Sequence, residues 1–215
     1  MRCLVACEES QAVTIELRRL GVEAYSCDVL PCSGGHPEWH LLQDVTPLLA
    51  DRWDMVIAFP PCTHLCVSGA SWWAKKRESG EQQAAIDFFL KCYNANSDFV
   101  AVENPPGIMG TMFRQCDQMV KANQFGEQCS KRLCLWLRGL PFLKQTNLVD
   151  AGHRTRHNHS QWYADSWKIN DPQQRSIVRS KTFPGVASAM AQQWSRFVAE
   201  KLRLSTLADS TCITS

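Results

Sequence analysis

The first half of the chain alternates short apolar runs with longer amphipathic stretches. The amphipathic stretches 10–20 and 81–95 carry apolar residues at helical spacing, and Ser10 and Gly21 are suited to begin and end the first helix. The apolar runs are typical of buried strands, and they lie at residues 2–6, 24–27, 54–59 and 98–102, with a further short strand expected at Asp44-Val45. This order predicts an α/β fold with a mostly parallel, doubly wound sheet.

The second half of the chain is less regular. Residues 113–123 predict a helix, 133–137 a strand, and 186–202 an amphipathic helix. Between residues 139 and 178 the chain is polar, rich in His, Asn and Trp, and without a clear period, which indicates a small irregular segment. The polar end of the chain, 205–215, is expected to be a flexible tail.

Composition narrows the class of protein without identifying it. Apolar residues make up 45% of the 215 positions and charged residues 20%, as in ordinary globular proteins, and the net charge is +2. No apolar run approaches the ~20 residues that a membrane helix needs, and no signal-peptide pattern opens the chain. The eleven cysteines are scattered and odd in number. We therefore expect no membrane partner and a cytoplasmic location in a reducing compartment.

Polar residues follow the predicted strands at their carboxyl ends, where open α/β sheets bind ligands. They are Cys7-Glu8-Glu9-Ser10, Asp28, Asp44, Pro60-Pro61-Cys62 and Glu103-Asn104. An acid after the second strand commonly holds a ribose hydroxyl, which predicts a nucleoside-containing cofactor. The two prolines before Cys62 end the strand and hold the thiol in a stiff turn.

Four segments of the chain, in their order along the sequence, resemble motifs of the DNA cytosine-5 methyltransferases, in the compact form seen in phage genomes. The motifs are FPPCTHL at 59–65, VENPPG at 102–107, FGEQCSKRLCLWLRGLP at 125–141 and RSKTFPGVASAMAQQW at 179–194. The resemblance covers most of the chain. It implies a Rossmann-like methyltransferase fold formed by residues 1–138 and 179–204, with 139–178 as a small basic target-recognition segment.

The resemblance also implies a mechanism at carbon 5 of cytosine. Cys62 would add to carbon 6 as a thiolate, the most nucleophilic side chain near neutral pH. Glu103 would supply a proton to N3, and Asn104 would orient the Glu103 carboxyl group. Arg132 or Lys131 would place a cation near the ring carbonyl. Because the target base is stacked in a duplex, it would be flipped into the site.

S-adenosyl-L-methionine is the cofactor that the resemblance implies. The helix beginning at Ser10 could accept its carboxylate on free backbone N–H groups, Asp28 would hold the ribose hydroxyls and Asp44 the adenine amino group. The remaining expected cofactor contacts are Cys7, Glu8 and Pro60. The family usually has glycines after the first strand, whereas this chain reads ACEESQAV. The methionine end of the cofactor must therefore bind differently, or another ligand is bound.

DNA is the expected partner, with a loose or very short target sequence, because residues 139–178 are too few for a separate domain. A free nucleotide is an alternative substrate, and the protein could be a monomer or a dimer. Trp136, Trp162 and Trp167 could stack on bases or serve as core. A basic stretch between residues 151 and 181 suits phosphate contacts as well as it suits a solvated loop. Its members are Arg154, Arg156, Lys168, Arg175, Arg179 and Lys181, with His153, His157 and His159.

Other interpretations remain open on the residues alone. The Asn-Pro-Pro turn at 104–106 is typical of amino-methyltransferases, although it follows the fifth strand here and ends in Gly107. A catalytically inactive relative that binds DNA or a protein is a third possibility. Glu8 and Glu9 could simply favour a helix N-terminus. Neither the group Cys32, His36 and His40 nor the later histidines complete a four-ligand zinc pattern, so no metal is expected.

Overall fold

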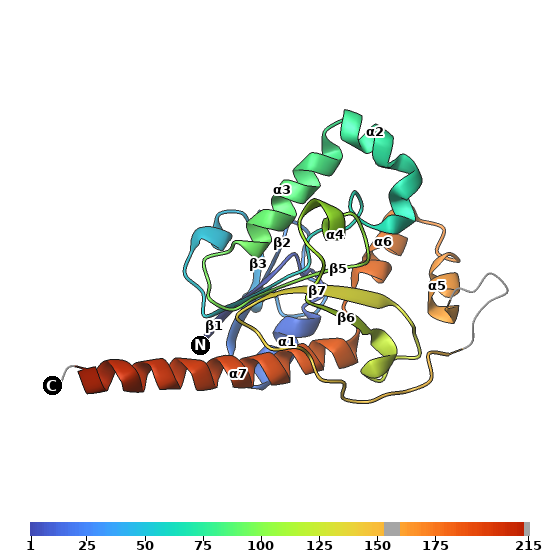
Figure 1. Cartoon of the computed structure of the whole chain (residues 1–215). Helices are drawn as coiled ribbons and strands as arrows, with labels where there is room; N and C mark the ends of the chain where they lie inside the picture. The colour runs from blue at the N-terminus through green and yellow to red at the C-terminus, as the bar shows by residue number, and fades with distance from the viewer. Residues whose placement is uncertain (153–159, 213–215) are drawn as a thin grey trace.

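The computed structural model describes residues 1–152 and 160–212 of the chain (Figure 1). One seven-stranded sheet has the order β3-β2-β1-β4-β5-β7-β6, and β7 alone runs antiparallel to both of its neighbours. This mixed, mostly parallel order is typical of the Rossmann-like methyltransferase fold, so the expected fold class is confirmed. The strands are β1 (Arg2–Ala6), β2 (Glu23–Asp28), β3 (His40–Leu42), β4 (Met55–Ala58), β5 (Val100–Asn104), β6 (Gln118–Lys121) and β7 (Arg132–Arg138).

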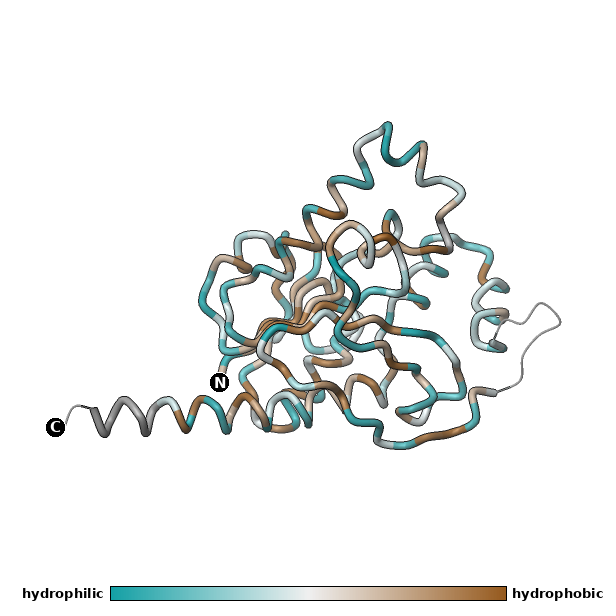
Figure 2. The backbone as a smooth tube through the Cα atoms, viewed as in Figure 1, coloured by the Kyte–Doolittle hydropathy of each residue, from teal (hydrophilic) through white to brown (hydrophobic). Residues whose placement is uncertain are grey.

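Helices cover both faces of the sheet and bury two apolar clusters. On one face α1 (Ala12–Arg19) packs beside α7 (Pro184–Cys212), where Leu17, Met190 and Trp194 are fully buried. On the other face α3 (Glu81–Tyr93) buries Phe89 against Trp136 of β7. Figure 2 shows the hydrophobic stretches gathered in the central strands between these layers. The continuous apolar runs of β1 and β4 are thus buried on both faces, as parallel strands require.

The remaining helices are short and lie around the ends of the strands. The α-helices are α2 (Trp73–Glu78), α4 (Met109–Met112), α5 (Gln161–Ser166) and α6 (Pro172–Ser180); the 3-10 helices are η1 (Pro37–Trp39), η2 (Leu48–Ala50), η3 (Val67–Trp72) and η4 (Ala122–Gln124). Two of them, α5 and α6, fall inside the segment that showed no clear period. The last helix, α7, continues to Cys212 and projects beyond the body of the molecule (Figure 1).

Three local predictions were wrong. The third strand is His40–Leu42 rather than Asp44-Val45, because Asp44 instead accepts the backbone N–H of Thr46 in a turn. Residues 113–123 do not form a helix but contain β6, an edge strand in which Met119 is exposed and Val120 buried. The first helix begins at Ala12, because the backbone of Gln11 is left-handed and cannot belong to a helix.

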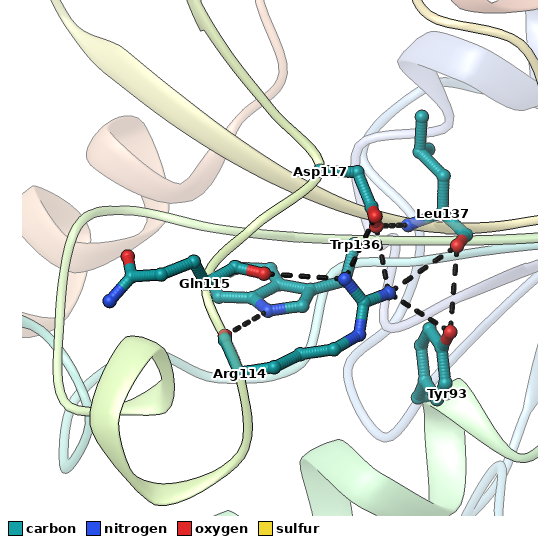
Figure 3. Close-up of polar contacts among 6 residues, drawn as sticks. All are labelled: Tyr93, Arg114, Gln115, Asp117, Trp136 and Leu137. Carbon is teal, nitrogen blue, oxygen red and sulfur yellow. Dashed lines mark hydrogen bonds and ion pairs between the residues drawn. The ribbon is translucent and has the colours of Figure 1, made fainter.

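A network of polar contacts fixes the approach to β6 against β7 (Figure 3). Arg114 places both terminal nitrogens 2.8 Å from the Asp117 carboxylate, and one of them also donates to the Tyr93 hydroxyl at 3.0 Å. Asp117 accepts the N–H of Leu137, and the indole of Trp136 donates to the Arg114 carbonyl. The ion pair holds the pKa of Asp117 below its usual range. This network joins α3, the segment before β6 and β7 at the antiparallel end of the sheet.

No helix among residues 1–152 and 160–212 is long and apolar enough to cross a membrane. The ten cysteines from Cys3 to Cys134 are free thiols.

Candidate active site

A cavity of about 490 Å³ opens at the carboxyl ends of β4 and β5. Four segments supply its walls: the turn after β4, the turn after β5, the start of β7, and the helices α5 and α6. Its lining includes Pro60, Cys62, Cys66, Glu103, Asn104, Lys131, Arg132, Trp162, Tyr163, Arg175 and Arg179. Its size is within the range of about 300–1,000 Å³ that is usual for small-molecule sites. Residues from positions 60 to 179 therefore meet in one cavity.

Cys62 lies in the turn that leaves β4. Its carbonyl accepts the N–H groups of Leu65 and Cys66, both at 3.0 Å, so the residues after the prolines form one tight turn. The side chain of Cys62 is hydrogen-bonded to that of Cys66. This bond, burial and the negative charges nearby raise the pKa of the Cys62 thiol, whereas the charge of Lys131 lowers it. The thiol is neutral at ordinary pH in the substrate-free protein.

The turns after β4 and β5 are bound to one another. The Asn104 amide nitrogen donates to the Pro60 carbonyl at 2.8 Å, across the two strand ends. Gly107 pairs with Cys66, and its backbone approaches so closely that a Cβ atom there would lie 2.2 Å from the Leu65 carbonyl oxygen. Only glycine allows this approach. The position of Cys62 therefore depends on the turn that follows Glu103.

Glu103 is the last acid of β5, and its carboxyl oxygen Oε1 is buried with no hydrogen-bond partner. Burial raises the pKa of Glu103 to about 7, although the charge of Lys131 lowers it. The Oδ1 atom of Asn104 is also buried and without a partner. Since buried polar atoms normally have partners, the two atoms indicate that a ligand with matching groups belongs here.

The two basic residues proposed for the ring carbonyl have different surroundings. The Lys131 ammonium lies 5.7 Å from the ring centres of both Trp162 and Phe183, and it donates to the Arg179 carbonyl at 3.0 Å. Lys131 is the cation whose charge acts on both Cys62 and Glu103. Arg132 also lines the cavity but is exposed at the start of β7. Lys131 is thus better placed than Arg132 to act on the thiol and the acid.

Aromatic rings and guanidinium groups from α5 and α6 form another part of the cavity wall. Arg179 stacks on Tyr163 at 4.4 Å, and Arg175 stacks on Trp167 at 4.5 Å. Sequence analysis gave these arginines only as members of a basic stretch and did not single out Tyr163. Their spacing of four residues on an amphipathic helix was the available signal.

Not every expected residue of the recognition segment reaches the cavity. Trp162 lines the cavity, but Trp136 is buried against Phe89 and cannot stack on a base. Trp167 lies beneath Arg175, outside the residues that line the cavity. The predictions for His153, Arg154, Arg156, His157 and His159 lie outside the described residues.

The expected cofactor residues gather at the ends of β1, β2 and β3, with Cys7 directly after β1. Glu8 has no free oxygen: Oε1 accepts the N–H of Val13 at 2.6 Å, and Oε2 accepts the N–H and the hydroxyl of Thr14. Glu8 therefore caps α1, and these N–H groups of the helix are not available to a ligand carboxylate. Burial raises the pKa of Glu8 to about 7, and the three hydrogen bonds oppose this rise.

Acceptors remain available near this edge of the sheet. Asp28 is half-buried, and its Oδ1 accepts a hydrogen bond from the N–H of Leu30. Burial raises the pKa of Asp28. Asp44 is exposed beyond β3, and its bonds to Thr46 lower its pKa. The Oε1 atom of Glu9 is buried without a partner, and the charge of Glu9 acts on Asp28. Ser10 accepts only a long bond, 3.5 Å, from the N–H of Ala12.

The loop after β2 covers the glycine-free turn after β1. The buried amide of Gln11 donates to the His36 carbonyl at 2.8 Å and accepts the His36 N–H at 3.1 Å. Gly34 approaches so closely that a Cβ atom would lie 2.7 Å from the Ser10 carbonyl. The Lys181 ammonium reaches the Ser33 hydroxyl at 3.0 Å. A glycine is thus needed in this region after all, but the β2–β3 loop supplies it.

The described residues contain no group of three or more His, Cys, Asp or Glu side chains that could hold a metal ion. His40 bonds through both ring nitrogens, to the Ser26 hydroxyl and the Leu30 carbonyl, each at 2.9 Å. His36 stacks on Trp39. Both histidines therefore stabilise the β2–β3 loop.

Comparison with known proteins gives distant structural likenesses. No family model and no curated protein matches the chain. A crystal structure of a protein proposed to be a DNA modification methyltransferase, encoded within an E. coli prophage, is similar with a TM-score of 0.47 and 14% identity. The likeness covers 70% of this chain and 52% of the other, so this chain spans about half the length of that protein.

Proposed function

We propose that the protein transfers a methyl group from S-adenosyl-L-methionine to carbon 5 of cytosine in DNA. The observation that carries the proposal is the pairing, in one cavity, of the Cys62 thiol with the unpartnered carboxyl group of Glu103. A pyrimidine ring needs both groups, because attack at carbon 6 must be matched by a proton at N3. The ordered motifs FPPC, VENPPG and FGEQCSKRLCLW support the same reaction.

The residues of the cavity divide the reaction between them. The Cys62 thiol releases its proton to solvent water, and its sulfur forms a bond to carbon 6. The electrons of the C5–C6 double bond move into the C4–C5 bond, and those of the C4–N3 double bond move onto N3. Glu103, whose pKa of about 7 leaves about half of the carboxyl groups protonated in neutral solution, donates its proton to N3. S-adenosyl-L-methionine supplies the electrophilic methyl group. Carbon 5 would bond to that methyl group while N3 returns its proton to the Glu103 carboxylate. Loss of the carbon-5 proton to solvent water then re-forms the C5–C6 double bond, breaks the S–C6 bond and releases the Cys62 thiolate.

Lys131 assists both partners by its charge. It lowers the pKa of Cys62 and of Glu103, and so stabilises the thiolate that attacks and the carboxylate that remains after proton transfer. Asn104 holds the two strand ends together through Pro60, which keeps the thiol and the acid in register. Arg132, at the rim of the cavity, is a second cation for the substrate.

The acceptor-rich edge at β1, β2 and β3 fits the proposed cofactor. S-adenosyl-L-methionine presents ribose hydroxyls, an ammonium and a sulfonium, all of which favour carboxylate oxygens. Asp28 would hold the ribose hydroxyls, Asp44 the adenine amino group, and the unpartnered Oε1 of Glu9 the ammonium. Cys7, Ser10 and Pro60 would complete the walls, while Glu8 acts on α1 rather than on the cofactor.

The alternatives are less well supported. An amino-methyltransferase usually has an aromatic residue where this chain has Gly107, and a side chain there would meet the Leu65 carbonyl. An inactive relative has no need of a buried acid without a partner, which costs stability.

The test is covalent trapping with single- and double-stranded DNA that contains 5-fluoro-2′-deoxycytidine. Fluorine at carbon 5 blocks the final elimination, so the Cys62 adduct should persist through denaturation when the cofactor is present. Cys62→Ala should abolish the adduct, and Cys32→Ala, which changes a thiol outside the cavity, should not. An adduct that survives Cys62→Ala, or no adduct with either DNA, would refute the proposal.

A further inference from the structure

We propose that Arg175 and Arg179 form the site for the DNA backbone phosphate beside the target cytosine, an inference that rests on the proposed function. Both side chains line the cavity that holds Cys62 and Glu103. They are one helical turn apart on α6, so their guanidinium groups lie on the same side of the helix. The cavity therefore contains an acid, a thiol and two guanidinium groups.

The two guanidinium groups are held by aromatic rings rather than by acids. Arg179 stacks on Tyr163 at 4.4 Å and also lies 5.5 Å from Trp167, on which Arg175 stacks at 4.5 Å. A stacked guanidinium keeps the N–H groups along its edge free to form the forked bonds that phosphate oxygens accept. One terminal nitrogen of Arg175, Nη1, donates to the Ile169 carbonyl at 3.1 Å.

Nearby acids are engaged elsewhere. Asp165 pairs with Lys168 at 2.6 Å, and Asp171 accepts the N–H of Gln173 at the start of α6. Within residues 1–152 and 160–212, no carboxylate lies within ion-pair distance of Arg175 or Arg179. Two cations in a cavity without an acidic partner favour an anionic ligand.

The position of α6 is fixed relative to the chemistry. The Lys131 ammonium donates to the Arg179 carbonyl at 3.0 Å, and the charge of the same ammonium acts on Glu103. A nucleotide places a base at one end and a phosphate at the other, with the sugar between them. Trp162 and Tyr163 also line this cavity. The phosphodiester of a polymer is the source that the proposed DNA substrate supplies.

The experiment measures binding of a fluorescent single-stranded oligonucleotide with one cytosine, by anisotropy, over a series of salt concentrations and without cofactor. The double variant Arg175→Gln/Arg179→Gln should bind at least about tenfold more weakly. For this variant the slope of log K against the logarithm of the salt concentration should become shallower by about 0.7, which is the value for one phosphate contact on a single strand. The matched control is Lys201→Gln/Arg203→Gln, which removes two charges from α7, outside the cavity.

Circular dichroism shows whether each variant is folded. The variant Arg175→Lys/Arg179→Lys retains both charges but lacks the planar guanidinium groups that stack and form paired hydrogen bonds. It should therefore recover only part of the affinity. The inference is overturned if the α6 double variant matches the α7 control in affinity and salt dependence. It is also overturned if wild type binds deoxycytidine 5′-monophosphate in preference to the oligonucleotide. Trapping at saturating DNA separates the two proposals: loss of binding with the adduct retained supports the phosphate site. Absence of any adduct from wild type refutes the proposed function, while the binding series still decides the phosphate site.

Discussion

Two buried glutamates with similar pKa values should respond unequally when each is replaced by glutamine. Burial raises the pKa of both Glu8 and Glu103 from 4.5 to about 7. Glu8 accepts three hydrogen bonds, whereas Oε1 of Glu103 has no partner. A raised carboxyl pKa means that the folded protein binds the proton more tightly than the unfolded chain. Stability is therefore lost as pH rises from about 4.5 to about 7.

The magnitude for Glu103 follows from this shift. A difference of 2.5 between 7 and 4.5 corresponds to about 3 kcal/mol above pH 7, since one unit is about 1.4 kcal/mol. Glu103→Gln removes this cost, so it should stabilise the protein at about pH 8 by up to about 3 kcal/mol. For a chain of this length the melting temperature should rise by roughly 6–12 °C. At about pH 5 the gain should fall below about 1 kcal/mol.

Glu8→Gln is the matched control, because it makes the same chemical change at a buried acid. Glu8→Gln also removes an ionisation cost of about 3 kcal/mol, but glutamine cannot accept all three bonds, and their loss cancels about 1–3 kcal/mol of that gain. This variant should therefore be stabilised much less than Glu103→Gln at about pH 8. Urea denaturation at the two pH values measures both effects, and DNA trapping should show that Glu103→Gln is stable but slow to form the adduct. The reasoning fails if Glu103→Gln is no more stable than wild type at about pH 8, or gains equally at both pH values.

Three further predictions test the framework of the site. Gly107→Ala should slow alkylation and trapping of Cys62 by tenfold or more, because a Cβ atom would displace the turn at Leu65; unchanged rates would contradict the close approach. Asp28→Asn should weaken S-adenosyl-L-methionine binding by about tenfold or more in calorimetry, and equal affinity would remove Asp28 from the cofactor site. Arg114→Met, which breaks the network in Figure 3, should lower the free energy of unfolding by about 1–3 kcal/mol, whereas Arg52→Met, at an exposed ion pair, should cost under about 1 kcal/mol; equal losses would contradict this account.

The strands with continuous apolar runs were predictable from sequence, because burial on both faces leaves little choice of residue. The edge strands were not. His40–Leu42 is short and has no buried residue, and β6 has one buried residue in four. The start of α1 was also missed, because the cap comes from Glu8 rather than Ser10. The left-handed residue Gln11 lies between Glu8 and the helix, and no local sequence pattern reveals it.

The candidate site was predictable where it follows strand ends. Cys62 and Glu103 follow adjacent parallel strands, so topology alone brings them near one another. The part of the cavity wall formed by α5 and α6 was not predictable in the same way. These helices reach the cavity through tertiary contacts such as the hydrogen bond from Lys131 to the Arg179 carbonyl. The choice between Lys131 and Arg132 needed the structure for the same reason.

The hydrogen bond from Lys131 to the Arg179 carbonyl has a consequence for how target preference can change over evolution. Lys131 holds α6 by a backbone carbonyl, which every amino acid possesses, so the bond places no demand on the side chain at position 179. The helix pair can therefore accumulate substitutions, or be exchanged for a homologous pair, without loosening its attachment to the catalytic machinery. Substitution is therefore constrained at Lys131 and permitted among the side chains of α5 and α6 that face the cavity, provided that an exchanged α6 ends at the same place.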